Sequence, residues 1–173
     1  VASVVDTIEQ RLCYVEKPEK KQALISALKE NDGRSVLVFS RTKHGADRIA
    51  RIVSKAGIGC DAIHGDKSQI DRQNALNRFK DGKIRVLVAT DIAARGLDIS
   101  ELSHVINYDV PSENEHYTHR IGRTGRAKKE GVSYLFYVPE EKKRVQELLR
   151  LTRNTDLCTP CLLYTSPSPR DRG

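Results

Sequence analysis

Apolar residues along the chain follow two periods that alternate with each other. Short apolar runs of strand type occupy residues 35–40, 84–90, 104–109 and 132–138, and the segments between them repeat apolar positions every three or four residues. The run "IRVLVAT" at 84–90 is almost continuously apolar, as expected for a strand that is covered on both faces. Strands that alternate with helices predict an α/β fold with a mostly parallel sheet and helices on both faces.

Helix boundaries are indicated by capping residues as well as by periodicity. Ser68 and Asp71 have the spacing of a capping box, which predicts a helix start, and the same spacing recurs at Ser112 and Glu115. We expect helices at 18–28, 44–56, 68–80, from Ser112 onward and at 139–151, with two further strands at 8–16 and 60–65.

The C-terminal segment 152–173 has no periodicity and is expected to be disordered. Cys158 and Cys161 form a C-x-x-C, but a structural zinc site needs a second pair of ligands and a redox pair should open a helix. The segment also resembles the translated read-through of a sequencing adapter. We therefore treat it as non-native sequence outside the fold.

Composition restricts the partners of the chain. The 173 residues are 38% hydrophobic, enough for one buried core, and the net charge of +7 favours a polyanionic partner such as nucleic acid or a nucleotide. No apolar run is long enough to span a bilayer, so we expect no membrane association. The four cysteines are too few and too scattered for a disulfide framework, which favours a reducing, cytoplasmic location. We expect a monomer.

Polar residues follow several of the predicted strands at their carboxyl ends. In open α/β sheets this edge is where ligands bind. Hydroxyl, basic, small and carboxylate side chains gather there, at residues 40–43, 64–66, 90–91 and 107–109.

The helix predicted from Ser68 adds a phosphate-binding feature to this edge. Gln69 and Arg72 lie side by side in its first turn, where free N–H groups and the positive end of the helix dipole favour an anion. Gly65 lets a ligand approach the backbone closely. The alternative is a surface ion pair of Arg72 with Asp71 or Asp66.

The segment "HRIGRTGR" at 119–126 places three arginines three residues apart with glycines between them. A solvated basic turn is the simplest interpretation. Guanidinium groups also suit phosphate oxygens, and the glycines remove side chains that would block their approach. The chain contains no G-x-x-x-x-G-K-S/T loop and no acidic run for magnesium, so this segment could touch a triphosphate that is held elsewhere.

Four segments in order, "VLVFSRTK", "HGDKSQIDR", "VLVATDIAARGLD" and "HRIGRTGR", resemble motifs of the second RecA-like domain of DEAD-box RNA helicases. Within that family, "FSRTKHGADRIA" and the compact end after the last strand are most similar to bacterial RhlE-type proteins. The resemblance implies a RecA-like three-layer sandwich over residues 7–151. Residues 1–6 would be a linker from a missing N-terminal RecA-like domain.

The resemblance also implies an ATP site shared with that missing domain, which would hold most of the ATP and its Mg²⁺. Arg123 and Arg126 would be catalytic arginine fingers that reach the γ-phosphate, a contribution worth about 10³ to 10⁵ in rate. Gly96 would lie near the nucleotide, and Asp98 would contact its ribose.

RNA contacts follow from the same resemblance. His119 and Arg120 would couple the ATP cleft to the RNA side. The contacts would be to the RNA backbone, so binding should be largely independent of sequence. The residues expected along the RNA path are Arg41, Lys43, Gly65, Gln69, Arg72 and Thr90.

We therefore expect the C-terminal half of an ATP-dependent RNA helicase, which couples ATP hydrolysis to RNA binding and local duplex unwinding. The chain alone should be inactive, because it lacks the ATP-binding loop, the D-E-A-D segment and the adenine-reading region. A related DNA helicase is one alternative, against which "HGDKSQ" and "ATDIAARGLD" argue. A stand-alone RNA-binding or partner-docking module without catalysis is another, and the upstream sequence would distinguish it.

Overall fold

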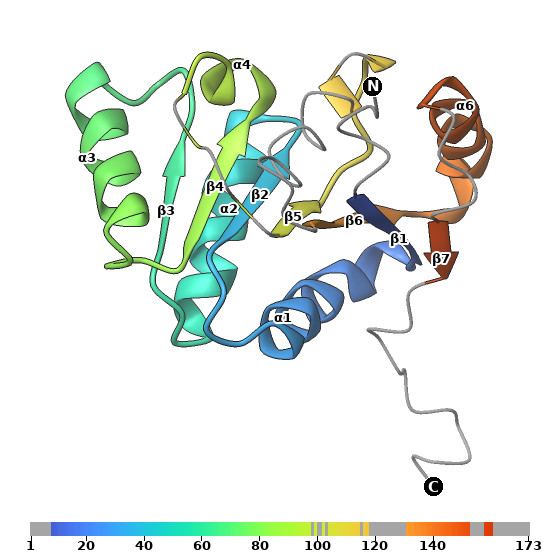
Figure 1. Ribbon diagram of the computed structural model, residues 1–173, viewed down its shortest axis with the longest axis horizontal. Coiled ribbons are helices and arrows are strands. Elements are labelled where there is room, and N and C mark those ends of the chain that lie inside the picture. The colour runs from blue at the N-terminus through green and yellow to red at the C-terminus, as the bar shows by residue number, and fades with distance from the viewer. Residues whose placement is uncertain are drawn as a thin grey trace, which may run out of the picture.

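Seven strands form one sheet in the order β3-β4-β2-β5-β6-β1-β7 (Figure 1). This computed structural model describes residues 8–97, 99, 102, 104–114, 116–117, 131–152 and 158–160. Every strand pair in this part of the chain is parallel. The strands are β1 (Ile8–Tyr14), β2 (Val36–Ser40), β3 (Cys60–Ile63), β4 (Val86–Thr90), β5 (His104–Asn107), β6 (Gly131–Tyr137) and β7 (Cys158–Pro160).

Helices connect these strands and cover the sheet. Two short 3₁₀ turns, η2 (Lys17–Glu19) and η4 (Pro139–Glu141), each contain a proline in the first turn, where its missing N–H costs nothing. The α-helices among the described residues are α1 (Lys20–Glu30), α2 (Lys43–Lys55), α3 (Gln69–Lys80), α4 (Asp91–Ala94) and α6 (Lys142–Thr152).

The alternation of side chains along β2 divides the core between the two faces of the sheet. Val36 and Val38 pack into a cluster with the apolar residues of α1 and α2. Leu37 and Phe39 pack with α3 and α4 on the other face. Leu135 of β6 joins a third cluster with α6. All five residues of β2 are buried, which confirms the predicted three-layer α/β architecture with a sheet covered on both faces.

The predicted elements agree with the structure in position, with two differences. The short helix α4 was not predicted, because four residues cannot show a helical period. The expected disorder of 152–173 is wrong at Cys158–Pro160, which pairs in parallel with β1 as β7. The helix expected from Ser112 falls partly outside the described residues.

Two cysteines of the described part are in different chemical states. Cys13 is disulfide-bonded, which differs from the reduced state expected from the sequence. Cys60 carries a free thiol, and burial together with the Asp61 carboxylate raises its pKa to about 12, so it stays protonated at neutral pH. No helix in the described part of the chain is both long and apolar enough to cross a bilayer.

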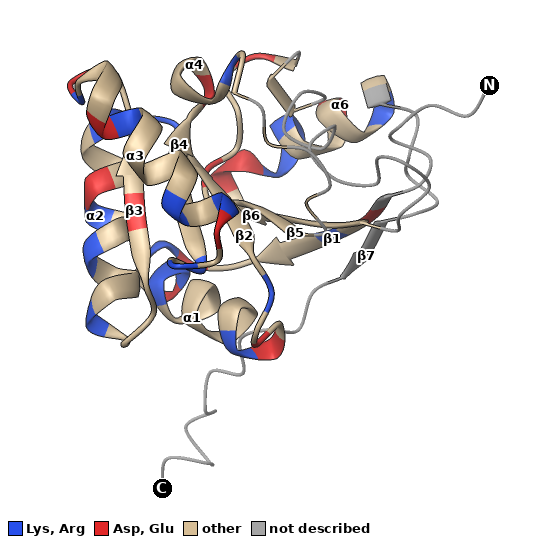
Figure 2. Cartoon of the chain, turned by 60° about the vertical axis from the view of Figure 1, so that its left-hand side comes forward, with Lys and Arg blue, Asp and Glu red and all other residues tan. Residues whose placement is uncertain are grey.

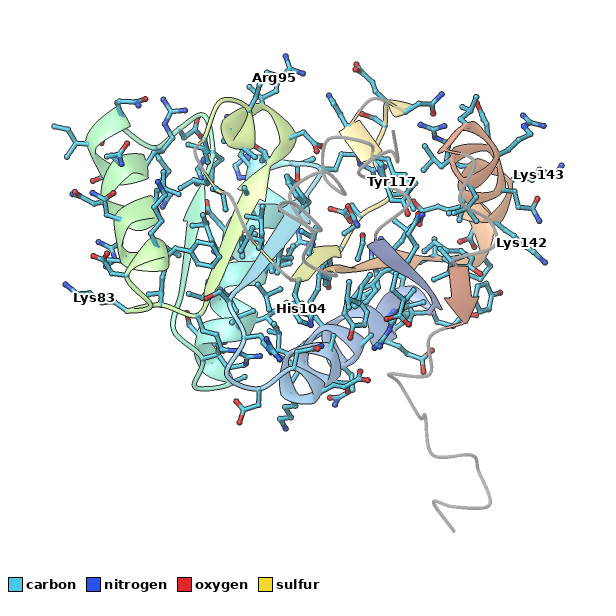
Figure 3. The ribbon with its side chains drawn as sticks, viewed as in Figure 1. Lys83, Arg95, His104, Tyr117, Lys142 and Lys143 are labelled. Carbon is cyan, nitrogen blue, oxygen red and sulfur yellow. The ribbon has the colours of Figure 1, made fainter. Side chains whose placement is uncertain are left out.

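His104, the first residue of β5, lies at the amino-terminal edge of the sheet beside α1 (Figure 3). Its side chain is buried, and burial is the main cause that lowers its pKa to about 4. The positive charges of Arg34, Arg11 and Arg85 lower the pKa further. His104 is therefore neutral in the folded chain over most of the acidic range.

This lowered pKa makes stability depend on pH. Between about pH 6.5 and pH 4 the unfolded chain binds a proton at His104 that the folded chain does not, so stability should fall by up to about 3 kcal/mol as the pH decreases through this range. Above pH 6.5 this contribution is constant. The His104→Asn variant should lose that part of the pH dependence in urea unfolding curves. If the unfolding free energy of His104→Asn changes between pH 7 and pH 4 as much as that of the wild type, this assignment is contradicted.

Candidate nucleic-acid interface

The carboxyl ends of the parallel strands meet at one edge of the sheet. Ser40 at the end of β2 pairs in register with Thr90 at the end of β4, and Phe39 pairs with Asn107 at the end of β5. The residues that follow each strand therefore lie next to one another across the edge. The polar groups at 40–43, 64–66, 90–91 and 107–109, predicted from sequence to gather, are brought together in this way.

Asp109, which follows β5, ties three elements together at this edge. Its carboxylate accepts a hydrogen bond from the backbone N–H of Arg41 at 2.9 Å and lies 3.1 Å from Nζ of Lys20 in α1. Burial acts to raise the pKa of Asp109, but the Lys20 charge and the Arg41 N–H outweigh it and hold the pKa below its usual range. The carboxylate is therefore ionised and fixes the backbone where β2 leaves the sheet.

Lys20 is the partner that sequence reasoning missed. Its side chain is only 12% exposed, and its ammonium lies 4.7 Å from the centre of the Tyr108 ring. Lys20 precedes Asp109 by 89 residues, so no local pattern connects the two. A cation held by a carboxylate and an aromatic face is paired within the protein, and it is not available to a ligand.

The start of α2 is packed tightly against the end of β2. Thr42 caps the helix by accepting a hydrogen bond from the N–H of Gly45, and Ser40 donates from its hydroxyl to the Thr42 carbonyl at 2.9 Å. A Cβ on Gly45 would lie 2.6 Å from Oγ of Ser40, so only glycine fits here. This packing places Arg41 and Lys43 on either side of the cap, both exposed to solvent.

Lys43 forms an ion pair across the edge with Asp66, 3.1 Å from its carboxylate. The hydrogen bond from Lys43 lowers the pKa of Asp66. Both side chains are well exposed, and exposed pairs of this kind contribute little stability, so a phosphate can replace Asp66 as the partner of Lys43. At Gly65, beside Asp66, a Cβ would meet no atom within 4 Å, so the space in front of this backbone is open.

The first turn of α3 forms the predicted phosphate-binding feature. Ser68 caps the helix through the N–H of Asp71 at 3.0 Å. Arg72 donates from Nη2 to the Gln69 carboxamide at 2.7 Å, so these side chains lie together as the spacing indicated. Nε of Arg72 is buried without a hydrogen-bond partner among the described residues. A buried N–H without a partner is costly, and a ligand oxygen could supply the missing acceptor.

The end of β4 contributes a hydroxyl, and a turn that contains Gly96 follows α4. Thr90 caps α4 through the N–H of Ala93, and its hydroxyl proton can still be donated. Gly96 has a φ of +80°, a conformation that other residues rarely adopt. Figure 3 shows Arg95 projecting from the same turn into solvent, a basic residue that sequence reasoning did not select.

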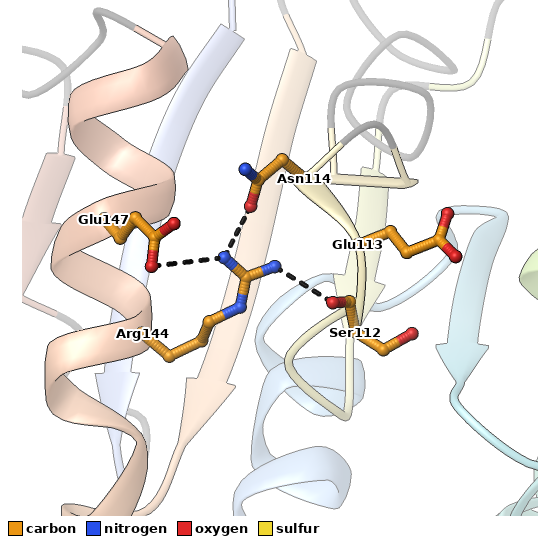
Figure 4. Close-up of a pocket in the computed structure, with 5 residues that line it drawn as sticks. All are labelled: Ser112, Glu113, Asn114, Arg144 and Glu147. Atoms are coloured by element: carbon orange, nitrogen blue, oxygen red, sulfur yellow. Dashed lines mark hydrogen bonds and ion pairs between the residues drawn. The ribbon is translucent and has the colours of Figure 1, made fainter.

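The loop after β5 is held from α6. Arg144 donates to the carbonyls of Pro111 and Ser112 and to the side chain of Asn114, and it pairs with Glu147 (Figure 4). The open pocket at this point is lined by Ser112, Glu113, Asn114, Arg144 and Glu147. The Arg144 contacts hold the loop after β5 at Pro111, Ser112 and Asn114.

A second contact holds the segment that follows β5, this time from β1. The buried hydroxyl of Tyr117 donates to the carboxamide oxygen of Gln10.

Five predicted site residues lie outside the described residues, so their roles stay predictions. They are Asp98, His119, Arg120, Arg123 and Arg126.

Comparison with known proteins identifies the group to which this architecture belongs. The family described as "Helicase conserved C-terminal domain" matches residues 19–128. The DEAD-box ATP-dependent RNA helicase CshA of Bacillus cereus is 44% identical over 142 residues, which are 81% of this chain and 27% of that protein. The chain thus spans about a quarter of the length of the curated relatives it matches.

Two solved structures show the same fold. A DEAD box protein from the hyperthermophile Methanococcus jannaschii superposes with a TM-score of 0.85 at 38% identity, covering 92% of this chain and 43% of that one. Saccharomyces cerevisiae Dbp5 bound to RNA and ADP BeF3 gives a TM-score of 0.83 at 25% identity, with coverage of 93% and 44%. The chain belongs to the helicase conserved C-terminal domain family.

Proposed function

We propose that this domain binds the RNA backbone at the carboxyl edge of its sheet and works as the C-terminal half of an ATP-dependent RNA helicase. The observation that carries this proposal is the first turn of α3, where Arg72 lies beside Gln69 with a buried Nε that lacks a partner among the described residues. A phosphate oxygen at the helix N-terminus would satisfy both this group and the free N–H groups of the turn.

The neighbouring groups extend the path from α3 along the strand ends. Arg41 and Lys43 are exposed cations, Thr90 offers a hydroxyl, and the backbone at Gly65 is open. Each of these groups suits a phosphate or a sugar oxygen, and such contacts position RNA without reading its sequence. We therefore expect binding that is largely independent of RNA sequence. The similarity to Dbp5, whose structure was solved with RNA and ADP BeF3 bound, supports this class of ligand.

ATP hydrolysis would need a second domain. The described residues contribute Gly96, whose open turn leaves room for a nucleotide, but they include no group of three His, Cys, Asp or Glu side chains that could hold a metal ion. We propose that ATP and Mg²⁺ are held mainly by an N-terminal RecA-like domain. Arg123 and Arg126 would then reach the γ-phosphate when the domains close, and Asp98 would contact the ribose. His119 and Arg120 would connect this contact to the RNA.

Other aspects of the proposal rest on sequence alone. They are the domain limits 7–151 with a linker at 1–6, a monomeric state, a cytoplasmic location and the similarity to RhlE-type proteins. The RhlE-type grouping is the finest of these, and it stays a prediction, since the curated relatives at 44% identity are CshA proteins.

RNA binding by the 173-residue chain tests the first part of the proposal. Single-stranded RNA should bind with an affinity that falls with salt by about 0.7 logarithmic units per phosphate contact for each tenfold increase. The Arg72→Gln variant should weaken binding about tenfold and lower the salt slope by about one contact. Fluorescence anisotropy titrations at several salt concentrations measure both quantities.

Arg78→Gln is the matched control, because Arg78 lies on the same helix and pairs with Asp61 away from this edge. It removes the same charge, so a general loss of positive charge would weaken both variants equally. Equal affinities for the Arg72 and Arg78 variants, or a strong preference for one RNA sequence, would count against the proposed interface.

The catalytic part of the proposal is tested at Arg123 in the two-domain protein. Arg123→Ala should lower RNA-stimulated ATP turnover by about 10³- to 10⁵-fold, with a smaller effect on ATP binding, since an arginine finger acts on the transferring phosphate. Arg123→Lys should restore little, because an ammonium lacks the planar fork of a guanidinium. Steady-state turnover and melting temperature are measured together. Normal turnover in Arg123→Ala would contradict the arginine-finger role of this residue.

A further inference from the structure

His64 is a buried polar residue in the middle of the proposed interface. It directly follows β3, and its side chain is 4% exposed. Its Nε2 lies 2.9 Å from Oδ1 of Asp47 in α2. Its Nδ1 accepts a hydrogen bond from the backbone N–H of Asp66 at 3.2 Å. The imidazole therefore joins α2 to the loop that carries Gly65.

These two contacts define the chemical state of the ring. An N–H always donates, so the Asp66 amide requires a lone pair on Nδ1. The single ring proton of a neutral imidazole is then on Nε2, from which it donates to the Asp47 carboxylate. A proton on Nδ1 would point at the backbone N–H of Asp66, and two donors cannot form a hydrogen bond. Only the neutral ring with its proton on Nε2 makes both hydrogen bonds.

The contacts of this ring reach the basic groups of the interface. Asp47 lies one helical turn after Lys43, which begins α2 and pairs with Asp66. Asp47 is also 3.9 Å from Nζ of Lys67, so its carboxylate contacts both His64 and Lys67, the residues that flank Gly65 and Asp66. A ring that fixes α2 relative to the loop also fixes the separation of Lys43 from the Gly65 backbone.

We propose that His64, held by Asp47, is a positioning residue that sets the 64–66 loop in the geometry needed to receive an RNA phosphate. This inference rests on the proposed RNA-binding function. The ring is buried and does not touch RNA itself. It acts through the backbone amide of Asp66 and the spacing of the loop from α2.

The direction in which RNA affinity changes when the Asp47 carboxylate is removed distinguishes a positioning role from a purely electrostatic one. The Asp47 carboxylate lies at a basic edge that is proposed to bind a polyanion. Removing this negative charge should by itself tighten RNA binding. If Asp47 orients His64, the same removal should weaken RNA binding, because the ring loses the acceptor for its Nε2 proton.

Two variants of Asp47 apply this test in the 173-residue chain, with single-stranded RNA as the probe. Asp47→Leu removes the acceptor, and we expect an RNA affinity about fivefold weaker than that of the wild type. Asp47→Asn keeps an oxygen that can accept from Nε2, and we expect an affinity within about twofold of the wild type. Asp47 is partly exposed on α2, so both variants should fold.

Asp61→Leu is the matched control. Asp61 lies on β3 and pairs with Arg78 of α3, so its loss also removes a carboxylate that joins two elements. It should leave RNA affinity unchanged or slightly tighter. Melting temperatures of all variants show whether a change in affinity only follows a loss of stability.

Nitrogen NMR of the His64 ring reads the tautomer without RNA. The wild-type chain should show a protonated Nε2 and an unprotonated Nδ1 at neutral pH. A proton on Nδ1 instead, or an affinity in Asp47→Leu equal to or tighter than that of the wild type, would overturn the inference. A wild-type chain that does not bind RNA at all would overturn the proposed function as well, which distinguishes the two failures.

Discussion

Parallel pairing is the constraint on which the rest of this structure depends. When all strands run in one direction, the ends that leave the core, and the helix N-termini that follow them, lie along one edge. The backbone alone therefore places exposed N–H groups and the positive ends of helix dipoles at this edge, without any charged side chain. Arg41, Lys43 and Arg72 add positive charge to the potential that the backbone already creates at this edge. Figure 2 shows that basic residues also occur along α2 and α3, so charge alone does not mark this edge.

A few buried polar contacts give this edge a defined shape. The Asp109 carboxylate holds the backbone of Arg41 and the ammonium of Lys20, and the His64 ring joins Asp47 to the Asp66 amide. Buried hydrogen bonds of this kind contribute modest net stability but are costly to leave unmade. Their main effect is therefore geometric, since they limit the positions that the surrounding loops can adopt. The exposed cations are placed by these contacts and keep weaker partners that a phosphate can displace.

The fold could be predicted from sequence because its cause is local. The unbroken apolar run of β4 and the spacing from Ser68 to Asp71 indicated a buried strand and a helix start, and both are found. Contacts between distant residues could not be predicted in this way. Lys20 and Asp109 are 89 residues apart, and neither residue type indicates the other. The strand order likewise depends on how complete elements pack, which no short pattern contains.

The candidate site was predicted in part for the same reason. Strand-end positions and the first turn of α3 are local features, so Gln69 and Arg72 were correctly placed side by side. Gly45 was missed because its need for a small side chain arises across a turn, where the Ser40 hydroxyl would lie 2.6 Å from any Cβ at this position. His64 was seen as one polar group among several, because its partner Asp47 reaches it only when α2 packs beside β3.

The most direct test of the central claim is to map the RNA contacts on the folded chain. Amide chemical shifts of the 173-residue chain would be followed by NMR as single-stranded RNA of uniform sequence is added at low salt. The account predicts changes at residues 40–43, 64–72 and 90–96, at the carboxyl edge. The opposite edge, including the turn at Lys83, should be unaffected (Figure 3). Changes concentrated at that opposite edge, or spread evenly over all basic residues, would contradict it.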